Sequence, residues 1–86
     1  MKTEKETIRE FSVELLNHIQ HLNGEPDKII SGMIKSVESC NNLSQLKMVK
    51  RDMLEWTQDI TGSELEKLDQ RLSEKGLPTL TNMRIK

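Results

Sequence analysis

Two histidines three positions apart are the first candidates for chemistry in this sequence. His18 and His21 would lie on neighbouring turns of one helix, with Glu14 one turn earlier as a possible third metal ligand. A catalytic zinc helix instead carries two histidines four positions apart with a glutamate between them, and His18-Ile19-Gln20-His21 does not match that pattern. His18 falls at the margin of an apolar stripe and His21 on a polar face. We therefore expect ordinary histidines, with no metal site and no cofactor.

Cys40 is the only cysteine, so it cannot form a disulfide within the chain. Its predicted place at the C-terminal end of a helix, on an apolar stripe, disfavours a reactive thiolate. The sequence contains no Gly-x-Ser-x-Gly turn, and its four glycines are scattered instead of forming a phosphate-binding loop. We expect a protein that is not an enzyme. With no apolar leader segment near the N-terminus, we also expect a cytoplasmic location.

Composition and charge narrow the classes of partner. The 86 residues include 13 basic and 14 acidic side chains, a formal net charge of −1, which gives no cationic surplus for binding phosphates. Aromatic residues make up 2% of the chain, too few for a surface that stacks bases. No apolar run is longer than two residues, which excludes a membrane span. Nucleic acid is therefore an improbable partner and a membrane is not expected.

Helical periodicity dominates the chain, and no convincing alternating strand pattern interrupts it. We predict helices at about 4–22, 26–40, 44–60 and 63–75, in a single domain covering residues 1–86. Start signals are Thr3 or Thr7, Ser44, and a capping box of Ser63 with Glu66. Stop signals are Asn23-Gly24, Asn41-Asn42, and Gly76 followed by Pro78. The predicted fold is all-α, a small antiparallel three- to four-helix bundle with an extended C-terminal tail at 77–86.

The third segment and the tail carry the apolar residues that matter most for function. Leu46, Val49, Met53, Trp56 and Ile60 alternate at steps of three and four, the spacing of a helix-packing seam. The tail keeps Leu77, Leu80, Met83 and Ile85 among polar residues, where a free tail would not need them. Further apolar residues lie beside the main stripes. Because three short helices cannot obviously cover all of this surface, we expect some of it to meet another chain.

A helix-turn-helix formed by residues 26–60 is the main alternative. In it the third segment would present four polar and basic side chains to a DNA major groove. These are Gln45, Lys47, Lys50 and Arg51. Three acidic residues on the same helix, Asp52, Glu55 and Asp59, oppose phosphate contact.

The sequence thus predicts a non-catalytic interaction or regulatory protein that acts through a helical apolar surface. We expect it to form a homodimer or to bind another protein. The interface candidates are Leu46, Val49, Met53, Trp56, Ile60, Leu80 and Met83.

Overall fold

The computed structural model describes residues 2–24 and 28–84 of the chain. Within these residues there are five α-helices and no β-strand, which confirms the all-α prediction. The helices are α1 (Glu4–Asn23), α2 (Lys28–Glu38), α3 (Leu43–Trp56), α4 (Gly62–Glu74) and α5 (Leu80–Arg84).

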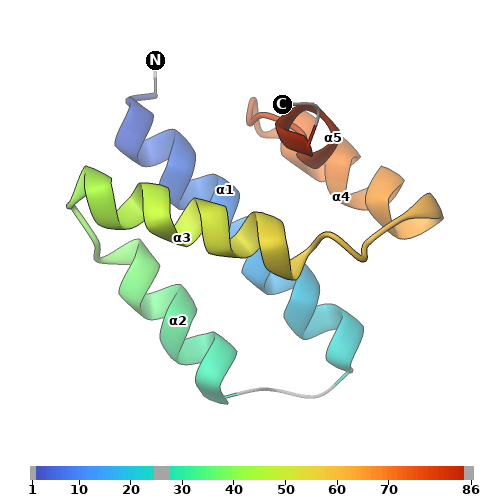
Figure 1. Cartoon of the computed structure of the whole chain (residues 1–86), viewed down its shortest axis with the longest axis horizontal. Helices are drawn as coiled ribbons and strands as arrows, with labels where there is room; N and C mark the ends of the chain where they lie inside the picture. The colour runs from blue at the N-terminus through green and yellow to red at the C-terminus, as the bar shows by residue number, and fades with distance from the viewer. Residues whose placement is uncertain (1, 25–27, 85–86) are drawn as a thin grey trace.

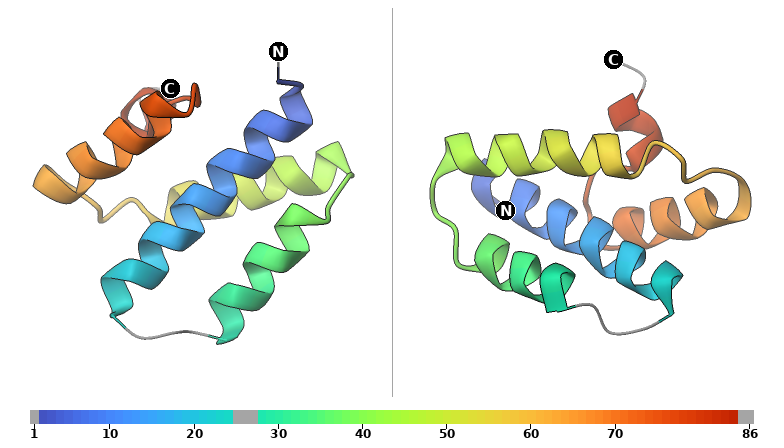
Figure 2. Two further views of the ribbon diagram at one scale, coloured as in Figure 1. Left: turned by 180° about the vertical axis from the view of Figure 1, so that it is seen from behind. Right: turned by 60° about the horizontal axis from the view of Figure 1, so that its bottom comes forward.

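The first helix is the centre of the fold, because α1 contacts α2, α3 and α4. α2 runs antiparallel beside α1, α3 crosses over α1 obliquely in the same general direction, and α4 with α5 covers the remaining side (Figure 1, Figure 2). Consecutive helices from α1 to α4 thus alternate in direction along the chain, and they pack obliquely against one another. Short connections allow consecutive helices to be antiparallel or sharply angled. The angled packing of α3 lets its apolar residues meet both α1 and α5.

All five helices contribute to one apolar core, which is largely aliphatic. Phe11 on α1 is fully buried and is its single aromatic ring. Burial of each large apolar side chain contributes roughly 1.5–3 kcal/mol to the stability of the fold. The buried apolar residues are Ile8, Phe11, Leu15, Leu16, Ile30, Val37, Leu46, Met53, Ile60, Leu68, Leu72, Leu77 and Leu80.

Both ends of α1 follow the sequence signals. Thr3 is the N-cap, and its hydroxyl oxygen accepts a hydrogen bond from the Glu6 amide at 3.2 Å. Gly24 ends the helix with φ of +72°, a left-handed conformation that costs glycine little. Of the two predicted starts, Thr3 and not Thr7 is therefore the one used.

The connection between α2 and α3 differs from the prediction. The predicted start of the second helix at residue 26 lies outside the described residues, and α2 ends at Glu38 instead of residue 40. Arg9 of α1 donates to the Cys40 carbonyl at 2.8 Å, which draws this connection onto α1. Asn42, and not Ser44, caps α3 by accepting from the Gln45 amide at 3.1 Å.

The C-terminal end of α3 lies four residues before the predicted end. The helix stops at Trp56, and the buried Thr57 hydroxyl donates to the Met53 carbonyl at 2.7 Å. The Ile60 amide then donates to the Thr57 carbonyl at 3.0 Å and closes a turn. The Met53 carbonyl also accepts the Thr57 amide at 3.0 Å, so the last helical hydrogen bond is kept beside the hydroxyl bond. Apolar spacing does not reveal this end, because Ile60 still reaches the core with 8% of its surface exposed.

The predicted capping box of the fourth helix is wrong. Thr61 is the N-cap of α4 and makes no side-chain cap hydrogen bond. Gly62, with φ of +63°, turns the chain into the helix one residue before Ser63, so that Ser63 lies inside the first turn. At the other end Gly76 has φ of +72°, and the Leu77 amide donates to the Leu72 carbonyl at 2.9 Å. This is the predicted glycine stop, with Leu77 buried.

The C-terminal segment is not an extended tail, because it contains the short helix α5. Asp69 of α4 accepts hydrogen bonds from the Leu80 amide at 2.8 Å and from the Thr81 hydroxyl, and so fixes the start of α5. Leu80 is fully buried and Met83 packs partly buried against the core. The predicted tail residue Ile85 lies outside the described residues.

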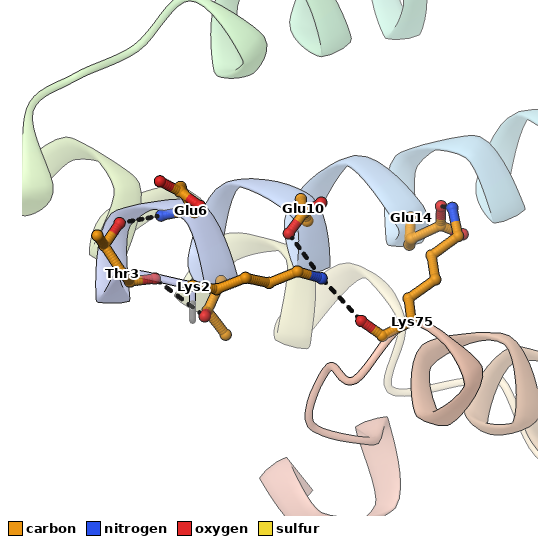
Figure 3. A network of polar contacts seen from close by, with 7 residues as sticks. Lys2, Thr3, Glu6, Glu10, Glu14 and Lys75 are labelled. Carbon is orange, nitrogen blue, oxygen red and sulfur yellow. Dashed lines mark hydrogen bonds and ion pairs between the residues drawn. The ribbon is translucent and has the colours of Figure 1, made fainter.

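A polar network joins the N-terminal residues to the end of α4 (Figure 3). Lys2 donates to the Lys75 carbonyl at 2.7 Å and pairs with Glu10 at 3.0 Å. The Lys75 ammonium pairs with Glu14, whose side chain is 9% exposed. Charge neutralisation by Lys75 makes this burial of a carboxylate possible.

Candidate functional site

The structure divides the seven predicted interface residues into core and surface. Leu46, Met53, Ile60 and Leu80 are buried, while Val49 and Met83 are partly buried against the same core. The seam of α3 therefore packs inside a single chain, against α1 and α5. Trp56 alone among the seven is exposed, with 53% of its surface accessible.

Trp56 lies at the last residue of α3, beside the C-terminal end of α1. With Ile19, Leu22 and Ile60 it lines a groove of about 330 Å³, which we call the α1–α3 groove. Leu22 is 47% exposed. Two large apolar side chains thus meet solvent together at this end of the molecule.

A second groove lies between α2 and α3, with a volume of about 320 Å³, and we call it the α2–α3 groove. Val37 and Cys40 line it from the α2 side. Gln45, Met48, Val49 and Asp52 line it from α3. Met48 is 65% exposed. The two grooves open along the same side of α3, defined by Gln45, Met48, Val49, Asp52 and Trp56, which we call the α3 flank.

Charge is segregated along α3 and the turn after it. Residues 43–51 of the helix include Lys47, Lys50 and Arg51 and no acidic residue. Asp52 and Glu55 follow in the C-terminal half, and Asp59 in the next turn, with no basic residue among them. This segment therefore has a positive end and a negative end on either side of the junction between Arg51 and Asp52.

The predicted DNA-contact residues fall at the start of α3. Gln45, Lys47 and Arg51 are exposed, and Lys50 is partly buried. The ammonium of Lys47 lies 3.8 Å from a carboxylate oxygen of Glu4 on α1, so its charge is partly neutralised within the chain. The structure brings the four residues onto one helix but also places the three acidic residues immediately after them.

A polar cleft between α1 and α4 contains His18. This histidine is 1% exposed, and its Nδ1 accepts a hydrogen bond from Arg71 Nη2 at 2.9 Å. Its Nε2 lies 3.5 Å from a carboxylate oxygen of Glu64. Burial lowers the pKa of His18 below 6.5, and Arg71 lowers it further against the opposing effect of Glu64. The arrangement holds a neutral imidazole whose hydrogen is on Nε2.

The three residues considered as metal ligands are not brought together. His21 is exposed, and Glu14 pairs with Lys75 instead of facing the histidines. In residues 2–24 and 28–84 no group of three histidine, cysteine or acidic side chains is arranged to hold a metal ion. Arg71 is 53 residues from His18, and no local pattern in the sequence marks it as a partner.

Cys40 is partly buried at the edge of the α2–α3 groove. Its thiol donates toward the Gln45 side-chain oxygen at 3.5 Å and the Asn42 carbonyl at 3.7 Å. In each contact the thiol is the donor, and its single hydrogen serves one of the two acceptors at a time.

In the part of the chain that the structure describes, no helix combines the length and apolarity needed to cross a bilayer. Comparison with protein-family models, with curated proteins and with solved structures finds no match for this chain.

Proposed function

We propose that this protein is a non-catalytic interaction protein that binds protein chains through the α3 flank and the adjoining Leu22, and that it self-associates. The observation that carries the proposal is the exposure of Trp56, the single tryptophan, beside the buried residues with which α3 completes the core. Tryptophan is highly buried on average in folded chains and is enriched among residues that dominate binding energy at interfaces. Met48 extends the exposed apolar surface along the same flank.

Nδ1 of His18 and the Glu14 carboxylate have structural partners, which supports a binding role over catalysis. His18 accepts from Arg71, and Glu14 neutralises Lys75. Arg9 binds the Cys40 carbonyl and the Asn41 side chain, and so connects α1 to the α2–α3 connection. We place the protein in the cytoplasm as part of this proposal, on the support of its single cysteine.

A DNA-binding regulator is the second candidate function. The observation in its favour is that Gln45, Lys47 and Arg51 are exposed at the start of α3, after the four-residue connection 39–42. Recognition helices contact base edges through their N-terminal residues. The Lys47–Glu4 pair and the acidic half of the helix weigh against it, because phosphate contacts need uncompensated positive charge.

Sedimentation equilibrium of the full chain over a wide concentration range tests the interaction proposal. We expect a concentration-dependent dimer in the wild type, and weaker association in Trp56→Ala with unchanged helix content by circular dichroism. Ile29→Ala is the matched control, because Ile29 is 76% exposed but lies outside the α3 flank, and it should associate like the wild type. A monomer at every concentration would overturn self-association.

A labelled DNA duplex in a fluorescence anisotropy titration at low salt tests the second candidate. The interaction proposal predicts no binding. Salt-dependent binding that Arg51→Ala weakens would instead favour the DNA-binding function.

A further inference from the structure

We propose that the partner is a second copy of this chain, docked with the two α3 helices antiparallel, so that Trp56 of each copy enters the α2–α3 groove of the other. This inference rests on the proposed function, because it specifies how the α3 flank is used. The identity of the partner and the orientation of the two α3 helices can each be tested separately from self-association.

The spacing of residues along the α3 flank sets the register. Gln45, Met48, Asp52 and Trp56 follow one another at steps of three and four, so they form one stripe on a helix with 3.6 residues per turn. Met48 and Trp56 lie four positions on either side of Asp52. A two-fold axis beside Asp52 therefore places Met48 of one copy opposite the partner's Trp56, and the reverse.

The α2–α3 groove has the chemistry to accept an indole ring. Val37, Met48 and Val49 supply apolar surface, and the volume of about 320 Å³ is near the lower end of the roughly 300–1,000 Å³ typical of ligand pockets. The Met48 sulfur makes favourable contacts with aromatic rings. Because Trp56 is already 53% exposed, this docking needs no core residue to leave the fold.

The charge distribution selects the antiparallel orientation and a like partner. A parallel pair would align the positive half of α3 with the partner's positive half, whereas an antiparallel pair opposes positive and negative halves. In the register centred on Asp52, Arg51 lies near the partner's Glu55. The two Asp52 side chains meet near the axis, where Arg51 of each chain can neutralise them. α3 carries positive charge before the Arg51–Asp52 junction and negative charge after it. Two copies of this surface related by a two-fold axis are therefore electrostatically complementary.

In the view of Figure 1, α3 lies in front of α1, and none of the described helices lies in front of α3. The buried side of α3 contacts α1 and α5. In the proposed dimer the second α3 approaches from the open side of the two grooves that the α3 flank lines.

Disulfide trapping in a Cys40→Ser background tests the orientation. Asp52→Cys and Gln45→Cys are compared after exposure to oxidised glutathione, with the products separated on a non-reducing gel. In the proposed dimer the two copies of position 52 face each other, while the two copies of position 45 are about 21 Å apart along the helix axes. Disulfides need Cα atoms within about 7 Å. We therefore expect a covalent dimer from Asp52→Cys and none from Gln45→Cys.

Each other outcome of trapping has a distinct meaning. Covalent dimers from both variants would indicate parallel helices and overturn the inference. No covalent dimer from Asp52→Cys, together with a dimer by sedimentation, would overturn the inference, and the proposed function would still stand if Trp56→Ala weakened that dimer. A monomer by sedimentation in the unmodified chain would overturn both.

Charge reversal gives a second measurement that does not depend on cysteine. Arg51→Glu and Glu55→Arg should each weaken the dimer about tenfold or more, because each places like charges together, and the double variant should recover much of the loss. Glu66→Arg on the exposed side of α4 is the matched control and should leave the dimer unchanged. If the two single variants lose equal amounts of dimer affinity and these losses add in the double variant, the pairing of Arg51 with the partner's Glu55 is wrong.

Discussion

Arg71 on α4 donates a hydrogen bond to Nδ1 of the buried His18 on α1 at 2.9 Å. This contact selects the tautomer, because an Nδ1 that accepts leaves the hydrogen on Nε2, which faces Glu64 at 3.5 Å. Protonation of His18 would point an N–H group at the Arg71 guanidinium. The contact between α1 and α4 therefore depends on a neutral imidazole.

We expect the stability of the fold to fall as the pH drops below about 6.5. Burial and Arg71 lower the pKa of His18 in the folded chain, with smaller lowering effects from His21 and Lys67 and an opposing effect from Glu64. The unfolded chain then binds a proton that the folded chain does not, so the contribution of His18 is complete above pH 6.5 and is lost as pH falls toward the lowered pKa.

Urea unfolding between about pH 7.5 and 5.5 measures this dependence. The free energy of unfolding of His18→Gln should depend less steeply on pH than that of the wild type. His21→Gln is the control and should retain it, because His21 is exposed. If the free energy of unfolding of His18→Gln depends on pH as steeply as that of the wild type, His18 is not the group responsible.

Core and surface residues of α3 should respond differently to truncation. Met53 is fully buried, so Met53→Ala should destabilise the chain by about 2–5 kcal/mol through lost burial and a cavity. Trp56→Ala should cost less than about 1 kcal/mol in a monomeric sample, since much of the indole is already in water. Denaturant titration at a concentration below association compares the two. A larger loss in Trp56→Ala would place the indole in the core.

Asp69→Ala should release α5 from α4. The carboxylate accepts from the Leu80 amide, the Thr81 amide and the Thr81 hydroxyl, and removal of such a cap costs about 0.5–2 kcal/mol. Hydrogen exchange should accelerate at the amides of residues 80–83, while α1 stays protected. Glu66→Ala on α4 is the control. Unchanged exchange in Asp69→Ala would show that Leu80 burial alone holds α5.

Replacement of two different glycines by alanine should change the free energy of unfolding in opposite directions. A Cβ at Gly76 or at Gly32 would meet no atom within 4 Å, so the backbone conformation alone determines how each substitution changes stability. Gly76 has φ of +72°, and Gly76→Ala should destabilise by about 1–2 kcal/mol. Gly32 lies inside α2, and Gly32→Ala should stabilise by about 0.5–1 kcal/mol. Thermal unfolding of both variants measures the difference, and a shift of the same sign in both would refute this explanation.

The sequence predicts those features of the fold that depend on neighbouring residues. The helical periodicity, the Thr3 cap and the glycine stops at Gly24 and Gly76 follow from local steric and hydrogen-bonding preferences. The end of α3 at Trp56 could not be predicted in this way, because the apolar spacing continues through the turn after the helix to the buried Ile60.

The candidate site was less accessible to sequence reasoning than the fold. Periodicity identifies an apolar stripe but not what covers it, so it could not separate the buried Met53 from the exposed Trp56 three positions later. The Arg71–His18 contact and the docking of α5 through Asp69 depend on the angles between helices. Those angles arise from packing across the whole chain.

The hydrogen bond from Lys2 to the Lys75 carbonyl joins residues 73 positions apart, next to the Glu14–Lys75 pair. α1 is synthesised before α4, so the Lys75 groups that Lys2 and Glu14 contact are absent when α1 first forms. The buried cluster around Phe11, Leu15 and Leu16 also includes Leu68 and Leu72 of α4, so it is complete only after α4 has been made. Folding of this domain therefore depends on contacts between segments far apart in the sequence, which slow the formation of the native state.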